Sequence, residues 1–239
     1  IMDLKTMFPN LTVMWTRWSD YHVISQYGMH FLVPTPDATS LTYDCTQQPG
    51  SLVADALDLG RQLAANTQEA DSLCASFAAH YGLLGLDYTG DTYGAAQGYE
   101  LPASMCPLNS QKYGDDLGQF QMTFIELYQH FCTVRGEEYP AAGSKFLDLS
   151  GVLNYRLTCG QTPQLIWQTE TLKEVLYLFY AALITDGKPT LKVCKNCGKV
   201  YYNPHAKSEF CGTKCRNYYN VKAFREKQLG HEESSFSSI

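Results

Sequence analysis

Residues 191–227 read LKVCKNCGKVYYNPHAKSEFCGTKCRNYYNVKAFREK and hold four cysteines in two close pairs. Two residues separate Cys194 from Cys197, three separate Cys211 from Cys215, and 13 lie between the pairs. Thiolates at such spacings can converge tetrahedrally on zinc, with Zn–S bonds of about 2.3 Å. The pattern therefore predicts one Zn²⁺ ion held by all four cysteines.

The residues around the cysteines predict a small finger of the treble-clef type. Gly198 gives the first pair the backbone freedom of a tight knuckle, and the second pair suits the start of a helix. Four protein ligands leave no position for water, which indicates a structural zinc. A redox dithiol is the alternative, but the strand-and-helix setting of thioredoxin-like motifs is absent. His205 could replace a ligand, although its place in the middle of the hairpin favours exposure to solvent.

Charge is divided unevenly along the chain. Residues 188–228 carry ten of the 18 Lys and Arg but two acids, a net charge of +8, whereas the rest of the chain has −14. An acidic body with a basic module predicts a polyanionic partner for the module. The alternative is that the two parts attract each other.

The helix expected after Cys215 carries the residues that we expect to contact nucleic acid. Lys and Arg neutralise phosphates, and Arg and Asn can also read base edges. Together with lysines of the finger, the predicted contact residues are Lys199, Lys207, Lys214, Arg216, Asn217, Asn220, Lys222, Arg225 and Lys227. Tyr201, Tyr202, Tyr218 and Tyr219 could stack on bases, but we expect them to form the core of the finger. Because apolar residues spread around this helix, we also expect it to pack on both finger and body.

The rest of the chain predicts a mainly α fold with a small β component, of the α+β class. Residues 21–45 are rich in β-forming residues and predict a hairpin or two short strands. Helices are expected from an N-cap at Ser51, from Asn66 to Gly82, over 117–136 and over 171–186, with a short strand in 163–168. Residues 87–116 predict a long loop, in which Asp115 and Asp116 are expected to be solvated.

Three parts follow along the chain: an acidic, mostly helical domain at 1–187, the zinc finger at 188–230 and a frayed tail at 231–239. No apolar run is long enough for a membrane span, and the first residues lack the layout of a secretory signal. Nine scattered or paired cysteines fit a reducing compartment. We therefore expect a cytoplasmic protein without a membrane partner.

The segment LNYRLTCGQTPQLIWQTETLKEVLYLFYAALITDGKPTLKVCKNCGKVYYNPHAKSEFCGTKCRNYYNVKAFREK resembles the C-terminal part of the CGNR-type zinc-finger proteins, which carry an ABATE-like N-terminal domain. These bacterial proteins are described as stress-related transcriptional regulators. The resemblance covers residues 150–228 well and the first 150 only by layout. It implies the same four zinc ligands and a helix that faces nucleic acid. The name-giving run is Cys215-Arg216-Asn217-Tyr218 here, the first knuckle is the shorter form, and Phe210 replaces a Trp.

The leading hypothesis is a DNA-binding transcriptional regulator whose N-terminal domain senses a small-molecule ligand or mediates assembly, with a homodimer as one arrangement. The second is a non-enzymatic protein in which the finger is a structural clasp or a protein-interaction module. No catalytic motif supports an enzyme.

Overall fold

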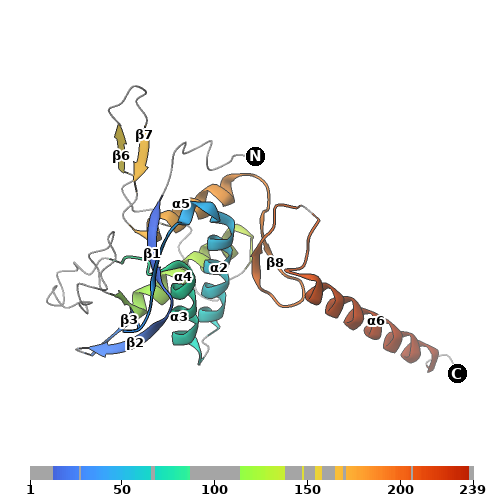
Figure 1. The fold of residues 1–239 in the computed structure, drawn as a ribbon. Helices are drawn as coiled ribbons and strands as arrows, with labels where there is room; N and C mark the ends of the chain where they lie inside the picture. The colour runs from blue at the N-terminus through green and yellow to red at the C-terminus, as the bar shows by residue number, and fades with distance from the viewer. Residues whose placement is uncertain are drawn as a thin grey trace.

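The computed structural model describes residues 13–26, 28–65, 68–86, 114–137, 147, 154–157, 165–168, 171–205 and 207–236. Within these residues the fold is a mixed α+β arrangement of five α-helices, one 3-10 helix and small antiparallel sheets. The strands β1 to β3 lie beside the helices α2 to α5, while α6 projects away from them (Figure 1). The expected α+β class is confirmed.

The N-terminal strands form two antiparallel pairings. β1 (Met14–Trp18) pairs with β4 (Ser40–Asp44), and β2 (Tyr21–Gln26) pairs with β3 (Met29–Pro34). The two expected strands on either side of the Pro-Asp turn are β3 and β4, but they pair with β2 and β1 and not with each other. The indoles of Trp15 and Trp18 are buried, so β1 contributes large side chains to the core.

The body's core lies among α2 (Pro49–Ala64), α3 (Ala70–Tyr81), α4 (Leu117–Val134) and α5 (Leu172–Thr185). α2 begins at Pro49, whose missing N–H suits a first helical position, and not at the expected cap Ser51. α3 ends at Gly82, as expected, with a left-handed φ of 94°. A capping box between Thr171 and Glu174 begins α5.

Asp115 and Asp116 are not the solvated loop pair that the sequence predicts. They form the short strand β5 (Asp115–Asp116), which pairs with β3. Asp115 is 0% exposed, and its carboxylate accepts hydrogen bonds from the backbone N–H groups of Leu84, Gly85 and Leu86. The Asp116 carboxylate accepts from the backbone N–H of Gln119 and caps α4. The buried carboxylate thus satisfies three donors of the segment that follows α3.

Some predictions fall on residues outside the described ranges. These are most of the long loop (87–113), the end of the tail (237–239) and the side chain of Lys227. The expected N-cap at Asn66 is wrong, because α3 begins at Ala70 with Glu69 at its cap. The expected strand at 163–168 is confirmed as β7 (Leu165–Gln168), which pairs with β6 (Asn154–Leu157).

The finger region begins with the hairpin of β8 (Leu191–Val193) and β9 (Val200–Tyr202) and continues into α6 (Thr213–Phe236). Leu191 and Val200 are buried in the same core as the body helices. The helix α6 continues to Phe236, so it extends into the segment expected as a tail at 231–239. Leu229, Glu232 and Glu233 favour helix, and Gly230 alone does not end it.

Candidate metal centre and basic helix

A tight knuckle between β8 and β9 positions the first cysteine pair. Gly198 adopts a left-handed φ of 72°, which lets its N–H donate to the Cys194 carbonyl at 2.9 Å. The Cys194 N–H donates to the carbonyl of Lys199, also at 2.9 Å. The side chains of Lys195 and Glu209, 2.6 Å apart, tie the knuckle to the segment before the second pair.

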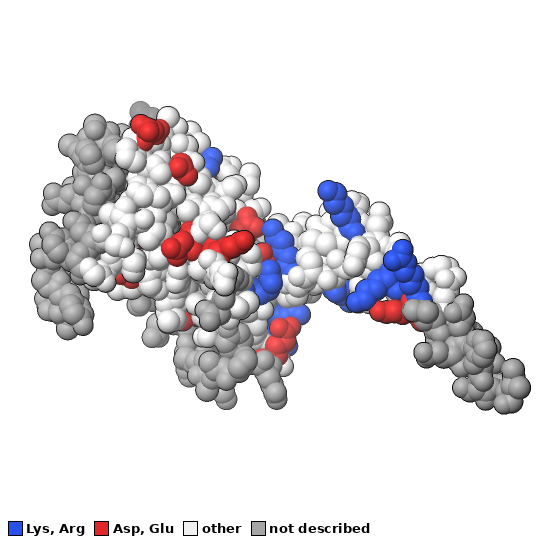
Figure 2. Space-filling view, turned by 90° about the horizontal axis from the view of Figure 1, so that it is seen from below, with Lys and Arg blue, Asp and Glu red and all other residues white. Residues whose placement is uncertain are grey.

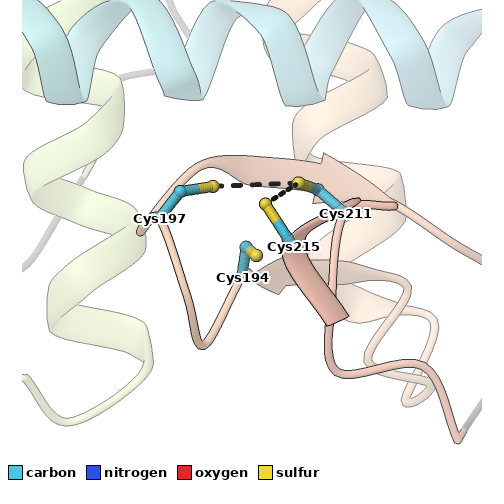
Figure 3. A group of neighbouring side chains, drawn as sticks. All are labelled: Cys194, Cys197, Cys211 and Cys215. Carbon is cyan, nitrogen blue, oxygen red and sulfur yellow. Dashed lines mark hydrogen bonds between the residues drawn. The ribbon is translucent and has the colours of Figure 1, made fainter. Parts of the chain in front are cut away.

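The four cysteines meet at one point. Their sulfur atoms point toward one another (Figure 3) and all lie within 4.8 Å of each other. The Sγ atoms of Cys197 and Cys211 are 3.7 Å apart, and those of Cys211 and Cys215 are 3.5 Å apart. A tetrahedral metal with bonds of about 2.3 Å holds its sulfurs about 3.8 Å apart. The thiols form no disulfide, so the group could hold a metal ion.

The environment of the four thiols is uneven. Cys194 is buried, Cys197 and Cys211 are exposed, and Cys215 is intermediate. Burial opposes ionisation of Cys194, but hydrogen bonds from the backbone N–H groups of Cys211, Cys197 and Asn196 outweigh it and lower its pKa to about 6. Burial and neighbouring thiols raise the pKa values of Cys197 and Cys211. These N–H groups therefore favour the thiolate of Cys194, whereas a bound cation would have to displace protons from Cys197 and Cys211.

Asp58 of α2 connects the finger to the body. Asp58 is 6% exposed, and its carboxylate accepts a hydrogen bond from the backbone N–H of Val200 at 3.1 Å. The side chains of Arg61 and Gln62 donate to the same carboxylate at 2.8 and 3.0 Å. Since Val200 is 0% exposed, Asp58 is the acceptor for a donor that has no access to water.

Two further contacts lie along the same side of α2. The ring of Tyr202 covers Gly50 so closely that a Cβ atom there would lie 2.5 Å from ring carbons. Lys199 approaches Asp55 at 3.8 Å, with both side chains about half exposed. Lys199, one of the predicted nucleic-acid contacts, therefore faces the acidic body. The hairpin side of the finger thus docks on α2.

The helix α6 does not pack on the body, contrary to expectation. Tyr218, Val221 and Phe224 are 67%, 50% and 61% exposed, and Figure 1 shows the helix pointing away from the other elements. Its contact with the finger is made by Tyr219, whose ring lies 5.3 Å from that of Phe210. The other apolar side chains of α6 are therefore open to solvent in the described part of the chain.

The predicted contact residues are placed on the surface of the finger and of α6. Figure 2 shows Lys and Arg gathered along this end of the molecule and most Asp and Glu on the body. Lys222 lies 4.0 Å from Glu226 of the same helix, and both side chains are 65% exposed. The following predicted residues are exposed: Lys199, Lys207, Lys214, Arg216, Asn217, Asn220, Lys222 and Arg225. His205 is exposed as expected and is outside the cysteine group.

The four tyrosines divide into different roles. Tyr201 is buried, and its hydroxyl donates to the Ser208 carbonyl, so it belongs to the core of the finger. Tyr202 packs on Gly50 and Tyr219 on Phe210. Tyr218 is 67% exposed, so the expectation of a core role is wrong for this residue.

The chain matches no protein-family model, no curated protein and no solved structure. Of the described helices, none combines the length and apolar character needed to span a membrane. Sequence reasoning missed Asp58 and Gly50 as docking residues. An acid between two apolar helix positions, Leu57 and Leu59, signals a buried partner, but no sequence signal identifies Val200 as that partner.

Proposed function

We propose that the four cysteines hold one structural Zn²⁺ ion in a treble-clef-like finger, and that this finger binds DNA in a transcriptional regulator. Zinc suits four thiolates, since it is borderline soft and accepts tetrahedral geometry. A knuckle within the β8–β9 hairpin, followed by the helix that bears Cys215, supports the assignment to a treble-clef-like finger. With four sulfur ligands there is no open position for a reacting water.

The observation that supports DNA binding is that α6 carries several exposed basic side chains and projects away from the body (Figure 1). Lys214, Arg216, Lys222 and Arg225 are exposed, and between 213 and 226 Glu226 is the sole acid. A helix that projects from its domain with several cations can approach a phosphate backbone without a clash from the body. The resemblance to CGNR-type regulators points the same way.

The test is binding of the zinc-loaded chain to mixed duplex DNA across a salt series. We expect affinity to fall steeply with salt, because bound cations release counterions from DNA. Arg216→Ala/Arg225→Ala should weaken binding and reduce the salt slope by roughly two. The control, Arg135→Ala/Lys173→Ala, removes the same charge from the body. An unchanged affinity in the α6 variant, or equal losses in both variants, would contradict the proposal.

A second candidate function is a structural clasp, and the docking contacts favour it. Val200 and Lys199 both face α2 through Asp58 and Asp55. In that case the finger would stabilise the body, and removal of the α6 charges would have no effect on any partner. The two functions use different sides of the finger, so the same binding experiment separates them.

A further inference from the structure

Exposed apolar side chains are concentrated on α6. Of the large hydrophobic residues exposed in the described parts of the chain, Tyr218, Tyr219, Val221 and Phe224 fall within seven consecutive residues. The others, on the body and the hairpin, are scattered: Met14, Leu41, Met122, Val134 and Tyr202. Scattered apolar residues are usual on a surface, whereas a cluster indicates a surface that is covered in function.

The cluster lies mainly on the side of α6 that looks away from the finger. Cys215 and Tyr219, one turn apart, mark the side that faces the finger. Successive residues of a helix are about 100° apart around its axis. Val221 and Phe224 therefore lie nearly opposite the side marked by Cys215 and Tyr219, and Tyr218 lies to one side of it. Lys214, Asn217 and Arg225 fall on the same half of the helix. We call this set the outward face of α6: Lys214, Asn217, Tyr218, Val221, Phe224 and Arg225.

The composition of the outward face does not suit a second copy of the helix. Its apolar part spans about two turns, and the next position on that side is Gln228, so no heptad seam continues. Pairing of two outward faces in register would also bring Lys214 and Arg225 against their own copies. The face contains no acid to offset them. The outward face instead complements a ligand that is a polyanion and also presents flat apolar surfaces.

Nucleic acid with unpaired bases has this chemistry. In a duplex the base faces are covered by their neighbours in the stack, and a protein reaches only base edges and phosphates. In a single strand the base faces are free to stack on aromatic side chains while cations hold the backbone. Tyr218 and Phe224 expose their rings beside Lys214 and Arg225.

We infer that the outward face of α6 binds single-stranded nucleic acid, with bases stacked on Tyr218 and Phe224 and phosphates held by Lys214 and Arg225. This rests on the proposed role of α6 as a nucleic-acid-binding helix and specifies the form of nucleic acid that it prefers. The shared chemistry of DNA and RNA single strands, unpaired bases on a phosphate chain, is what the face recognises.

The experiment is fluorescence anisotropy of the full zinc-loaded chain with labelled oligothymidine, oligouridine and a duplex of equal length at one salt concentration. We expect tighter binding to single strands than to the duplex. Tyr218→Ala and Phe224→Ala should each weaken single-strand binding by roughly 5- to 100-fold and change duplex binding little. Tyr218→Phe keeps the ring and should retain the affinity. Met122→Ala, at a residue of α4 that is 52% exposed, is the matched control.

The outcomes separate this inference from the proposed function. Equal affinity for duplex and single strand, unaffected by the ring variants, would overturn the stacking inference and leave duplex binding intact. Absence of binding to every probe would overturn both. If Phe224→Ala instead changes the sedimentation of the chain, the face pairs two copies and the inference is wrong. Zinc content and circular dichroism of each variant verify that its finger is folded, and Tyr218→Phe supplies a ring-retaining comparison should an alanine variant fail to fold.

Discussion

Asp58 is the side chain on which the junction between body and finger depends most directly. It lies on α2, yet one of its hydrogen bonds reaches Val200, 142 residues further along the chain. Two donors of its own helix, Arg61 and Gln62, hold the carboxylate in place. Because both donors belong to α2 itself, they hold the carboxylate in the orientation that the Val200 N–H requires, which reduces the entropy cost of docking.

Replacement of Asp58 by Ala should lower the free energy of unfolding by about 1–3 kcal/mol, because the buried N–H of Val200 would lose its acceptor. Urea denaturation of the zinc-loaded chain measures this. Asp58→Asn keeps one acceptor oxygen and should cost less than Asp58→Ala. A loss below about 0.5 kcal/mol, the range of ordinary surface substitutions, would show that the hydrogen bond does not hold the finger.

The hairpin β8–β9 and the helix α2 form a contact that is tight at one point. Gly50 lies in the first turn of α2 under the ring of Tyr202. Because the near atoms include the first ring carbon and not only the far end of the side chain, a rotation of the ring alone cannot make room. The absence of a side chain at Gly50 thus allows the hairpin to approach the first turn of α2 this closely.

The variant Gly50→Ala should weaken the docking of the hairpin, since its new Cβ atom would overlap the Tyr202 ring. In an otherwise unchanged chain we expect a loss of about 1–3 kcal/mol in unfolding free energy, typical of overpacking. In a Tyr202→Ala background the same change should be neutral or stabilising, because Ala is a better helix former than Gly. Urea denaturation measures the loss of unfolding free energy in both backgrounds. Equal losses would show that the effect does not come from the contact between Gly50 and Tyr202.

The helices could be predicted well from periodicity, except for the starts of α2 and α3, whereas the pairing of the strands could not be predicted. The residues of α4 and α5 repeat at helical spacing, and Thr171 with Glu174 marks a helix start directly. The partners of β3 and β4 depend on contacts across the sheet, which local sequence does not encode. The burial of Asp115 has the same origin, because its three donors lie about 30 residues earlier in the chain.

The cysteine group could be predicted because the three spacings between its cysteines are short and local, but the exposure of α6 could not. The spread of Tyr218, Tyr219, Val221 and Phe224 around the helix indicates neighbours on several sides. A sequence cannot distinguish a neighbour within the chain from a partner outside it. In the structure the finger covers one side, and the rest remains open.

In the molecule as a whole, finger and body share one core. Leu191 and Val200 of the hairpin are buried in the same cluster as the helices of the body, although the charges of the two parts differ in sign. A metal ion bound at the knuckle would therefore act on more than the finger, because the knuckle connects β8 to β9, which contacts α2. Binding to the folded state alone raises the stability of everything that folds with it.

Removal of the metal should accordingly have one local and one distant effect. With a chelator such as EDTA, α6 loses its anchored first turn, and a helix without packing is marginal in water, so the circular dichroism signal at 222 nm should decrease. The body should remain folded but melt lower by roughly 2–12 °C, as expected from about 1–3 kcal/mol of lost docking.

Cys197→Ser should reproduce both effects and lose zinc, whereas Cys74→Ala, outside the metal group, should keep one zinc per chain. The distant effect should depend on the junction: in the Asp58→Ala variant, metal removal should shift the melting of the body less than in the unchanged chain. An equal shift in the two proteins would show that the metal stabilises the body by a route other than this contact. No shift in either would show that the finger folds independently of the body.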